Sequence, residues 1–119
     1  MKAAKFRYIA PRSLDEALQH LNSDPDAKML AGGQSLMPLL AMRLAAPSTL
    51  IDLQHIPGLS EIEQEGNDIR IGARVTHRMV ERSELLKQRV PILPAAARYI
   101  AHPQIRSRGT FGGSTAHAD

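Results

Sequence analysis

Two pairs of adjacent glycines are the residues of this 119-residue chain whose type and spacing best suit chemistry. The first pair lies in the segment Ala31-Gly32-Gly33-Gln34-Ser35, and the second lies in Thr110-Phe111-Gly112-Gly113-Ser114. Glycine lets backbone N–H groups approach an anion without an intervening side chain. Each pair also has a hydroxyl residue beside it. If the fold brings the two segments together, they would form a cradle for a pyrophosphate group.

Each glycine pair also has an ordinary structural explanation. Gly32-Gly33 could form a tight turn between a strand and a helix, because such turns often need positive φ angles. Gly112-Gly113 could belong to a solvated tail near the end of the chain. Each pair alone is therefore ambiguous, and the cradle depends on the fold bringing the two together.

Other kinds of site lack their sequence signatures. The five histidines are far apart in the sequence and have no paired carboxylates, and the chain has no cysteine for thiolate ligands or disulfides. The Gly-Lys-Ser/Thr of a P-loop, the Gly-x-Gly-x-x-Gly of a dinucleotide fold and the Gly-x-Ser-x-Gly of a hydrolase are all missing. A nucleotide site in this chain must therefore be of another kind.

Composition and charge narrow the class of protein. The formal net charge is +3, but the basic residues are scattered among acidic ones, and only two Tyr and two Phe could stack bases. A solvated surface with some anion affinity is therefore favoured over a nucleic-acid-binding domain, which is the weakest alternative. The sequence has no apolar run of about 18 residues, so we expect no membrane span. With no cysteine and no apolar segment after the basic N-terminus, we expect a cytoplasmic protein.

The first glycine pair belongs to a segment in which strand and helix patterns alternate. The predicted elements are strands over residues 6–9, 28–31 and 49–53 and helices over residues 14–21 and 35–44. Ser13, with Glu16 three residues later, has the spacing of a capping box at the first helix. The pattern predicts a parallel βαβαβ unit with right-handed crossovers over residues 1–55. Gly32-Gly33 would then lie where a strand ends and a helix begins, which is where open parallel sheets bind anions.

The pattern changes near residue 56. Residues 59–65 and 68–73 alternate between polar and apolar positions, and the turn signal Gly66-Asn67 lies between them. This pattern predicts an antiparallel hairpin. No flexible run of glycine and serine separates the two halves of the chain, so the change marks a subdomain boundary rather than a linker.

Two further helices are predicted after the hairpin. Thr76 would cap a short helix over residues 77–81, and we interpret His77 as a surface or capping histidine rather than a catalytic base. The second helix is predicted over residues 91–101, with a buried stripe made of Ile92, Leu93, Ala96 and Ile100. Residues 104–119 are predicted to be irregular.

The two glycine segments, taken with their surroundings, resemble a known family. Residues 31–44 resemble the first flavin loop of the FAD subunits of molybdenum hydroxylases, and residues 106–119 resemble the second. These subunits are the medium subunits of bacterial carbon monoxide dehydrogenase and of quinoline oxidoreductase-type enzymes, related to the FAD domain of xanthine oxidase. The resemblance covers the whole chain, and two long motifs in the right order make it specific. Phe111 departs from the pattern, because Ile or Leu is usual there.

The resemblance implies an α+β fold, the FAD-binding fold of the vanillyl-alcohol-oxidase type. A small parallel βαβαβ subdomain, residues 1–55, would carry the first FAD loop. The beginning of an antiparallel α+β subdomain, residues 56–119, would carry the second, and FAD would lie between the two. Family members run to well over twice this length, so the second subdomain is expected to be truncated relative to the family.

The resemblance also implies which residues line FAD. Backbone N–H groups from Gly32 to Ser35 would donate to the pyrophosphate, and the second motif would close the other side. We expect no catalytic residue and no metal ligand. The implied cofactor-binding residues are Lys28, Met29, Leu30, Ala31, Gly32, Gly33, Gln34, Ser35, Leu36, Ile100, Ala101, Thr110, Gly112, Gly113, Ser114 and His117.

The function implied by the resemblance is electron transfer. A molybdenum cofactor on a molybdopterin-binding large subunit would hydroxylate the substrate, and two iron–sulfur clusters on a small subunit would relay the electrons. FAD would then pass them to an external acceptor such as NAD or oxygen. The alternative is a truncated, non-catalytic fragment that keeps the fold and the subunit contacts but does not bind FAD. We expect the isolated chain to be inactive.

Overall fold

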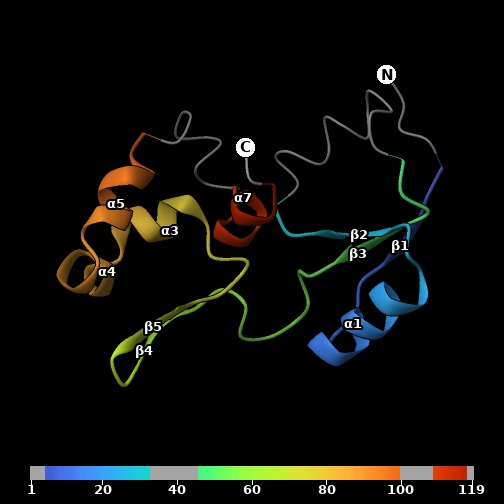
Figure 1. Cartoon of the computed structure of the whole chain (residues 1–119), viewed down its shortest axis with the longest axis horizontal. Coiled ribbons are helices and arrows are strands. Elements are labelled where there is room, and N and C mark those ends of the chain that lie inside the picture. Colours follow the sequence, from blue (N-terminus) through green and yellow to red (C-terminus); the bar gives the residue numbers. More distant parts are fainter. Residues whose placement is uncertain (1–4, 33–45, 100–108, 118–119) are drawn as a thin grey trace. The chain divides into compact units, whose positions relative to one another are not determined.

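The chain folds into two compact units, Met1–Pro57 and Gly58–Asp119. The computed structural model describes residues 5–32, 46–99 and 109–117 (Figure 1). Each unit is described by itself below.

The first unit contains a three-stranded parallel sheet. Its described elements are β1 (Arg7–Ile9), α1 (Leu14–Ser23), β2 (Ala27–Leu30) and β3 (Thr49–Asp52). The strand order is β1-β3-β2, so β3 is central, and all four of its residues are buried. The predicted parallel sheet is confirmed. The predicted helix over residues 35–44 lies outside the described residues.

Local hydrogen bonds fix both ends of α1. The Ser13 hydroxyl accepts a hydrogen bond from the Glu16 backbone N–H at 3.2 Å, which confirms the predicted cap. At the other end, Asp24 Oδ2 accepts from Ser48 Oγ at 2.7 Å and from Thr49 Oγ1 at 2.9 Å. These two hydrogen bonds lower the pKa of Asp24 and join the end of α1 to the start of β3.

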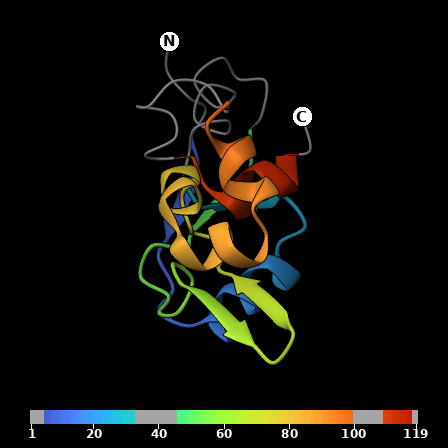
Figure 2. The same cartoon turned by 90° about the vertical axis from the view of Figure 1, so that its left-hand side faces the viewer.

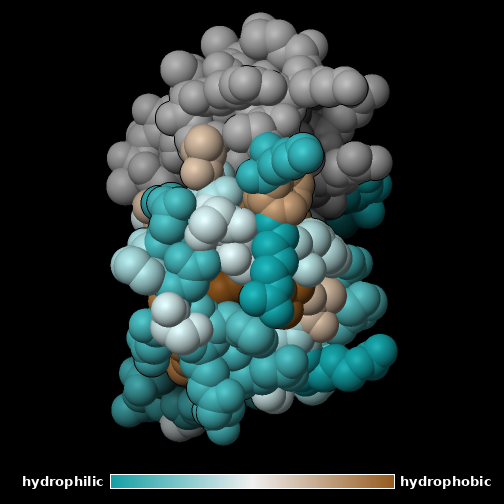
Figure 3. Space-filling view, turned by 90° about the vertical axis from the view of Figure 1, so that its right-hand side faces the viewer, coloured by the Kyte–Doolittle hydropathy of each residue, from teal (hydrophilic) through white to brown (hydrophobic). Residues whose placement is uncertain are grey.

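Among the described residues visible in Figure 3, hydrophilic residues predominate and hydrophobic ones form only small areas.

The second unit begins with the predicted hairpin. Its strands are β4 (Ile62–Glu65) and β5 (Asp68–Ile71), joined by a turn in which Gly66 has a φ of +60°. In the antiparallel register Ile62 lies opposite Ile71. Opposite residues share a face of the hairpin, so the isoleucines gather on one side and pack against the core of the unit.

The described part of the second unit also contains four short helices. They are α3 (His77–Arg82), α4 (Glu84–Arg89), α5 (Ile92–Ala97) and α7 (Phe111–His117). Figure 2 shows α3, α4 and α5 with the hairpin of the same unit. The buried core of this unit is Val75, Val80, Leu86 and Ala97.

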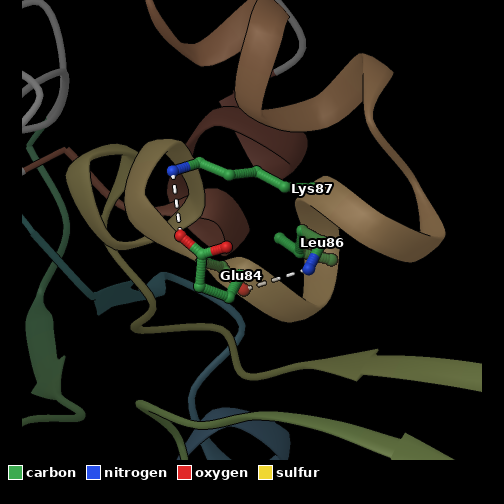
Figure 4. Close-up of polar contacts among 4 residues, drawn as sticks. Glu84, Leu86 and Lys87 are labelled. Carbon is green, nitrogen blue, oxygen red and sulfur yellow. Dashed lines mark hydrogen bonds and ion pairs between the residues drawn. The ribbon is translucent and has the colours of Figure 1, made fainter.

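Hydroxyl side chains cap the first two of these helices. Thr76 Oγ1 accepts from the Met79 N–H at 3.1 Å, as predicted. Ser83 Oγ accepts from the Leu86 N–H at 3.2 Å and starts α4, a helix that the sequence analysis did not predict. Figure 4 shows this first turn, where Lys87 Nζ lies 3.3 Å from Glu84 Oε1 on the surface.

Two predictions for the second unit are wrong, one of them only in part. Leu93 packs against the core, as predicted. Ile92 is 71% exposed and Ala96 is also exposed, whereas the buried residues of α5 are Pro94 and Ala97, so the predicted stripe is wrong at positions 92 and 96. Its fourth member, Ile100, lies outside the described residues. The predicted irregular stretch contains α7, which forms because Thr110 caps it: Thr110 Oγ1 accepts from the Gly113 N–H at 3.0 Å. The alternative that Gly112-Gly113 belongs to a solvated tail is therefore also wrong.

Candidate functional site

The first glycine pair starts at the carboxyl edge of the parallel sheet. Ala31 and Gly32 follow β2 directly. Leu30, the last residue of β2, is paired with Asp52, and its carbonyl accepts from the Leu53 N–H at 3.1 Å. The pairing of β2 with β3 therefore continues up to Leu30, directly before Ala31 and Gly32. Gly33, Gln34, Ser35 and Leu36 lie outside the described residues.

The sheet register separates the candidate residues of β2 between two faces. Lys28 pairs with Leu50 and Leu30 pairs with Asp52, while Met29 pairs with Ile51. Since alternate residues of a strand point to opposite faces, Lys28 and Leu30 share one face of the sheet and Met29 lies on the other. Tyr8 also pairs with Leu50, so it shares the face of Lys28.

A polar cluster lies on that face at the end of β3. Asp52, only 6% exposed, accepts hydrogen bonds from the Tyr8 hydroxyl and from Gln54 Nε2, the latter at 2.8 Å. Asp52 Oδ1 also accepts from the Gln54 backbone N–H at 3.0 Å. The bond to Asp52 raises the pKa of the Tyr8 phenol above its ordinary value. The sequence pattern did not predict this cluster, although Asp52, an aspartate at the end of a buried strand, was a signal for it.

The second glycine pair is held against the segment that leads into α3. The His77 N–H donates to the Gly109 carbonyl at 3.0 Å, and Phe111 N–H donates to the Val75 carbonyl at 2.7 Å. The Gly112 N–H donates to the Ala73 carbonyl at 3.0 Å. This antiparallel pairing carries the chain into α7.

Packing within the chain explains why position 112 is glycine, and it constrains position 113 less. A Cβ at position 112 would lie 2.7 Å from the Ala73 carbonyl oxygen and 2.8 Å from the Ala73 Cβ. A Cβ at position 113 would lie 2.7 Å from Thr110 Oγ1, the group that accepts the Gly113 N–H. The close approach permitted by Gly112 is therefore an approach to the chain's own backbone.

The side chain of His77 contacts the second motif. Its Nε2 lies 2.7 Å from Ser114 Oγ on α7. His77 is only 4% exposed, and burial lowers the pKa of its imidazole. The prediction of a surface or capping histidine is wrong, because the residue is buried at the start of α3 and contacts α7. Of the other predicted residues, Ile100 and Ala101 lie outside the described residues, and His117 is the last residue of α7.

The described residues contain neither a metal-binding cluster nor a membrane-spanning helix. Within residues 5–32, 46–99 and 109–117, no group of three or more His, Asp or Glu side chains is arranged to hold a metal ion. In the same ranges, no helix has the length and apolar character needed to cross a membrane.

The sequence matches a family model described as "FAD binding domain in molybdopterin dehydrogenase" over residues 4–119. The chain belongs to this family. The resemblance stated from the two glycine motifs is thereby confirmed.

Relatives within the family include medium subunits or chains of hydroxylases and dehydrogenases. The chain is 50% identical to the nicotine 6-hydroxylase medium subunit of Paenarthrobacter nicotinovorans, over 100% of this chain and 42% of the relative. It is 45% identical to the carbon monoxide dehydrogenase medium chain of Hydrogenophaga pseudoflava, over 95% of this chain and 40% of the relative. The chain thus spans about two fifths of the length of these relatives.

Solved structures of the family share the fold. Quinoline 2-oxidoreductase from Pseudomonas putida 86 matches with a TM-score of 0.95 and 50% identity, over 100% of this chain and 42% of that one. The carbon monoxide dehydrogenase of Oligotropha carboxidovorans matches with a TM-score of 0.96 and 41% identity, with the same coverage. The α+β fold, with a parallel three-stranded sheet and an antiparallel hairpin, is therefore that of the FAD-binding domain in this family.

Proposed function

We propose that this chain binds FAD as part of the flavin subunit of a molybdenum hydroxylase, with an FAD fold of the vanillyl-alcohol-oxidase type. The observation that carries the proposal is the family match over residues 4–119, which includes both glycine motifs. The names of the relatives, such as "medium subunit" and "medium chain", support a role within a larger assembly.

The donor groups that the structure describes fit a pyrophosphate-containing cofactor. The first glycine loop starts at the carboxyl edge of a parallel sheet, where peptide N–H groups are available to anions. Lys28, exposed on the face of Leu30, supplies a positive charge. In the second motif the exposed Ser114 supplies a hydroxyl, whereas the Gly112 and Gly113 N–H groups already donate within the chain. The full set of proposed FAD-binding residues is the one implied by the family resemblance.

The role of the chain's own residues in this function is binding and orientation. When bound, FAD supplies the redox chemistry that connects the iron–sulfur clusters of a small subunit to an external acceptor such as NAD or oxygen. The first loop would hold the pyrophosphate through backbone donors, and Gly112 would keep α7 close to the segment at Ala73. No side chain here is assigned an acid–base role. Substrate hydroxylation would belong to a molybdopterin-binding large subunit, and a cytoplasmic location is part of the proposal.

The visible spectrum of the purified chain tests this function. We expect flavin absorbance in the purified protein, or its retention after FAD is added and excess cofactor is removed by gel filtration. Circular dichroism of the same sample reports whether the chain is folded. A folded, colourless chain that retains no flavin would contradict FAD binding and would support the alternative of a non-catalytic fragment.

A further inference from the structure

We propose that His77 is a positioning residue for the cofactor site. Its imidazole donates a hydrogen bond to the Ser114 hydroxyl and thereby leaves the hydroxyl hydrogen free to donate to a phosphate oxygen of the cofactor. The inference rests on the proposed function, since it assigns the cofactor as the acceptor.

The backbone places the two side chains together. His77 begins α3, and its own N–H donates to the Gly109 carbonyl at 3.0 Å. The neighbouring bond from Phe111 N–H to the Val75 carbonyl fixes the start of α7 against the same segment. With both segments held, His77 Nε2 reaches Ser114 Oγ at 2.7 Å, although 37 positions separate them in the sequence.

Ser114 matters because the other donors at the start of α7 are already used. The Gly112 N–H donates to the Ala73 carbonyl, and the Gly113 N–H donates to Thr110 Oγ1. The Thr115 hydroxyl donates to the Phe111 carbonyl at 2.8 Å. The Ser114 side chain is exposed, so its hydroxyl is the donor in this turn that an external ligand can reach.

The tautomer of His77 decides what the Ser114 hydroxyl can do. A neutral imidazole carries one N–H and one lone pair on its ring nitrogens. If Nε2 carries the proton, Ser114 Oγ accepts a hydrogen bond from the Nε2 N–H, and the hydroxyl hydrogen of Ser114 points away from the ring. If Nε2 carries the lone pair, the hydroxyl donates inward and has no hydrogen for an anion. Phosphate diesters accept but do not donate at neutral pH, so they select the first arrangement.

A double-mutant cycle on FAD affinity tests the proposal. The variants are His77→Phe, Ser114→Ala and the double variant, with Kd measured from the quenching of flavin fluorescence. Each single change is expected to weaken FAD binding about tenfold, the effect of one hydrogen bond to a charged group. Because His77 acts through Ser114, the double variant should bind about as weakly as Ser114→Ala alone. His77→Gln can place an amide N–H near the position of Nε2 and should retain most of the affinity.

Two measurements keep the test independent of folding. Urea unfolding of each variant reports stability, and a purely structural role for His77 would lower stability without the coupling to Ser114. Nitrogen-15 NMR of the wild-type imidazole reports the tautomer even if His77→Phe does not fold. If the losses of FAD affinity multiply in the double variant, the proposed role of His77 is wrong. The same follows if Nε2 is unprotonated in a chain that binds FAD. Either result would leave the proposed function standing. A wild-type chain that binds no FAD would overturn the proposed function as well.

Discussion

Gly112→Ala places a methyl group where the chain has no room for one. The added Cβ would lie 2.7, 2.8 and 2.9 Å from the carbonyl oxygen, Cβ and Cα of Ala73. None of these atoms belongs to a flexible side chain that could rotate away. The bond from the Gly112 N–H to the Ala73 carbonyl, at 3.0 Å, also holds the two backbones together.

The expected loss follows from three effects. Overpacking of this kind costs about 1–3 kcal/mol. The strained hydrogen bond to Ala73 loses up to about 1 kcal/mol. Replacing glycine by alanine in a helix returns about 0.5–1 kcal/mol. The net expectation is a loss of about 1–3 kcal/mol in the free energy of unfolding.

Gly113→Ala is the matched control. Its Cβ would meet one atom, Thr110 Oγ1 at 2.7 Å, and that side chain can rotate away. The loss of the cap, about 1 kcal/mol, is offset by the helix preference of alanine. Urea unfolding followed by circular dichroism measures both variants. If Gly112→Ala is as stable as Gly113→Ala, the packing argument for Gly112 is wrong.

Three further predictions concern the stability of the fold. Leu86→Ala should lose about 2–5 kcal/mol in urea unfolding because Leu86 is fully buried, whereas Ile92→Ala, at a position that is 71% exposed, should lose less than about 0.5 kcal/mol; equal losses would contradict the assigned core. Because burial lowers the pKa of His77 below its ordinary 6.5, the unfolded chain binds this proton first, and stability should fall as the pH decreases below 6.5. His77→Gln should remove that part of the pH profile, and an unchanged profile would refute the burial argument. Hydrogen bonds lower the pKa of Asp24 below its ordinary 3.8, so its contribution to the stability of the fold is present above pH 3.8 and is lost as the pH falls further. Asp24→Asn should flatten this loss of stability in acid, and a pH profile identical to that of the wild type would contradict the assigned role of Asp24.

The parts of the fold that the sequence predicted depend on local signals. The cap at Ser13, the cap at Thr76 and the Gly66-Asn67 turn involve residues that are close in sequence, and the structure contains all three features. The parallel sheet followed from apolar segments alternating with a helical pattern. These signals require no knowledge of distant contacts.

The parts that were missed depend on contacts between distant segments. α7 contains two glycines, which disfavour a helix by about 1 kcal/mol each, and it forms against residues 73–77 far back in the sequence. The same pairing buries His77 and brings it to Ser114. The bond between Tyr8 and Asp52 joins residues 44 positions apart. The family resemblance named Ser114, whereas its contact with His77 is evident only in the structure.

The affinity of the chain for FAD compared with riboflavin tests the central claim most directly. Riboflavin lacks the pyrophosphate and adenosine that the glycine loops are proposed to hold. Two charge-assisted hydrogen bonds of about 1.5 kcal/mol each correspond to a factor of about 100 or more in Kd. We predict saturable FAD binding that is tighter than riboflavin binding by at least this factor, and its loss in Gly33→Val. No saturable binding, or equal Kd values for the two flavins, would contradict the account.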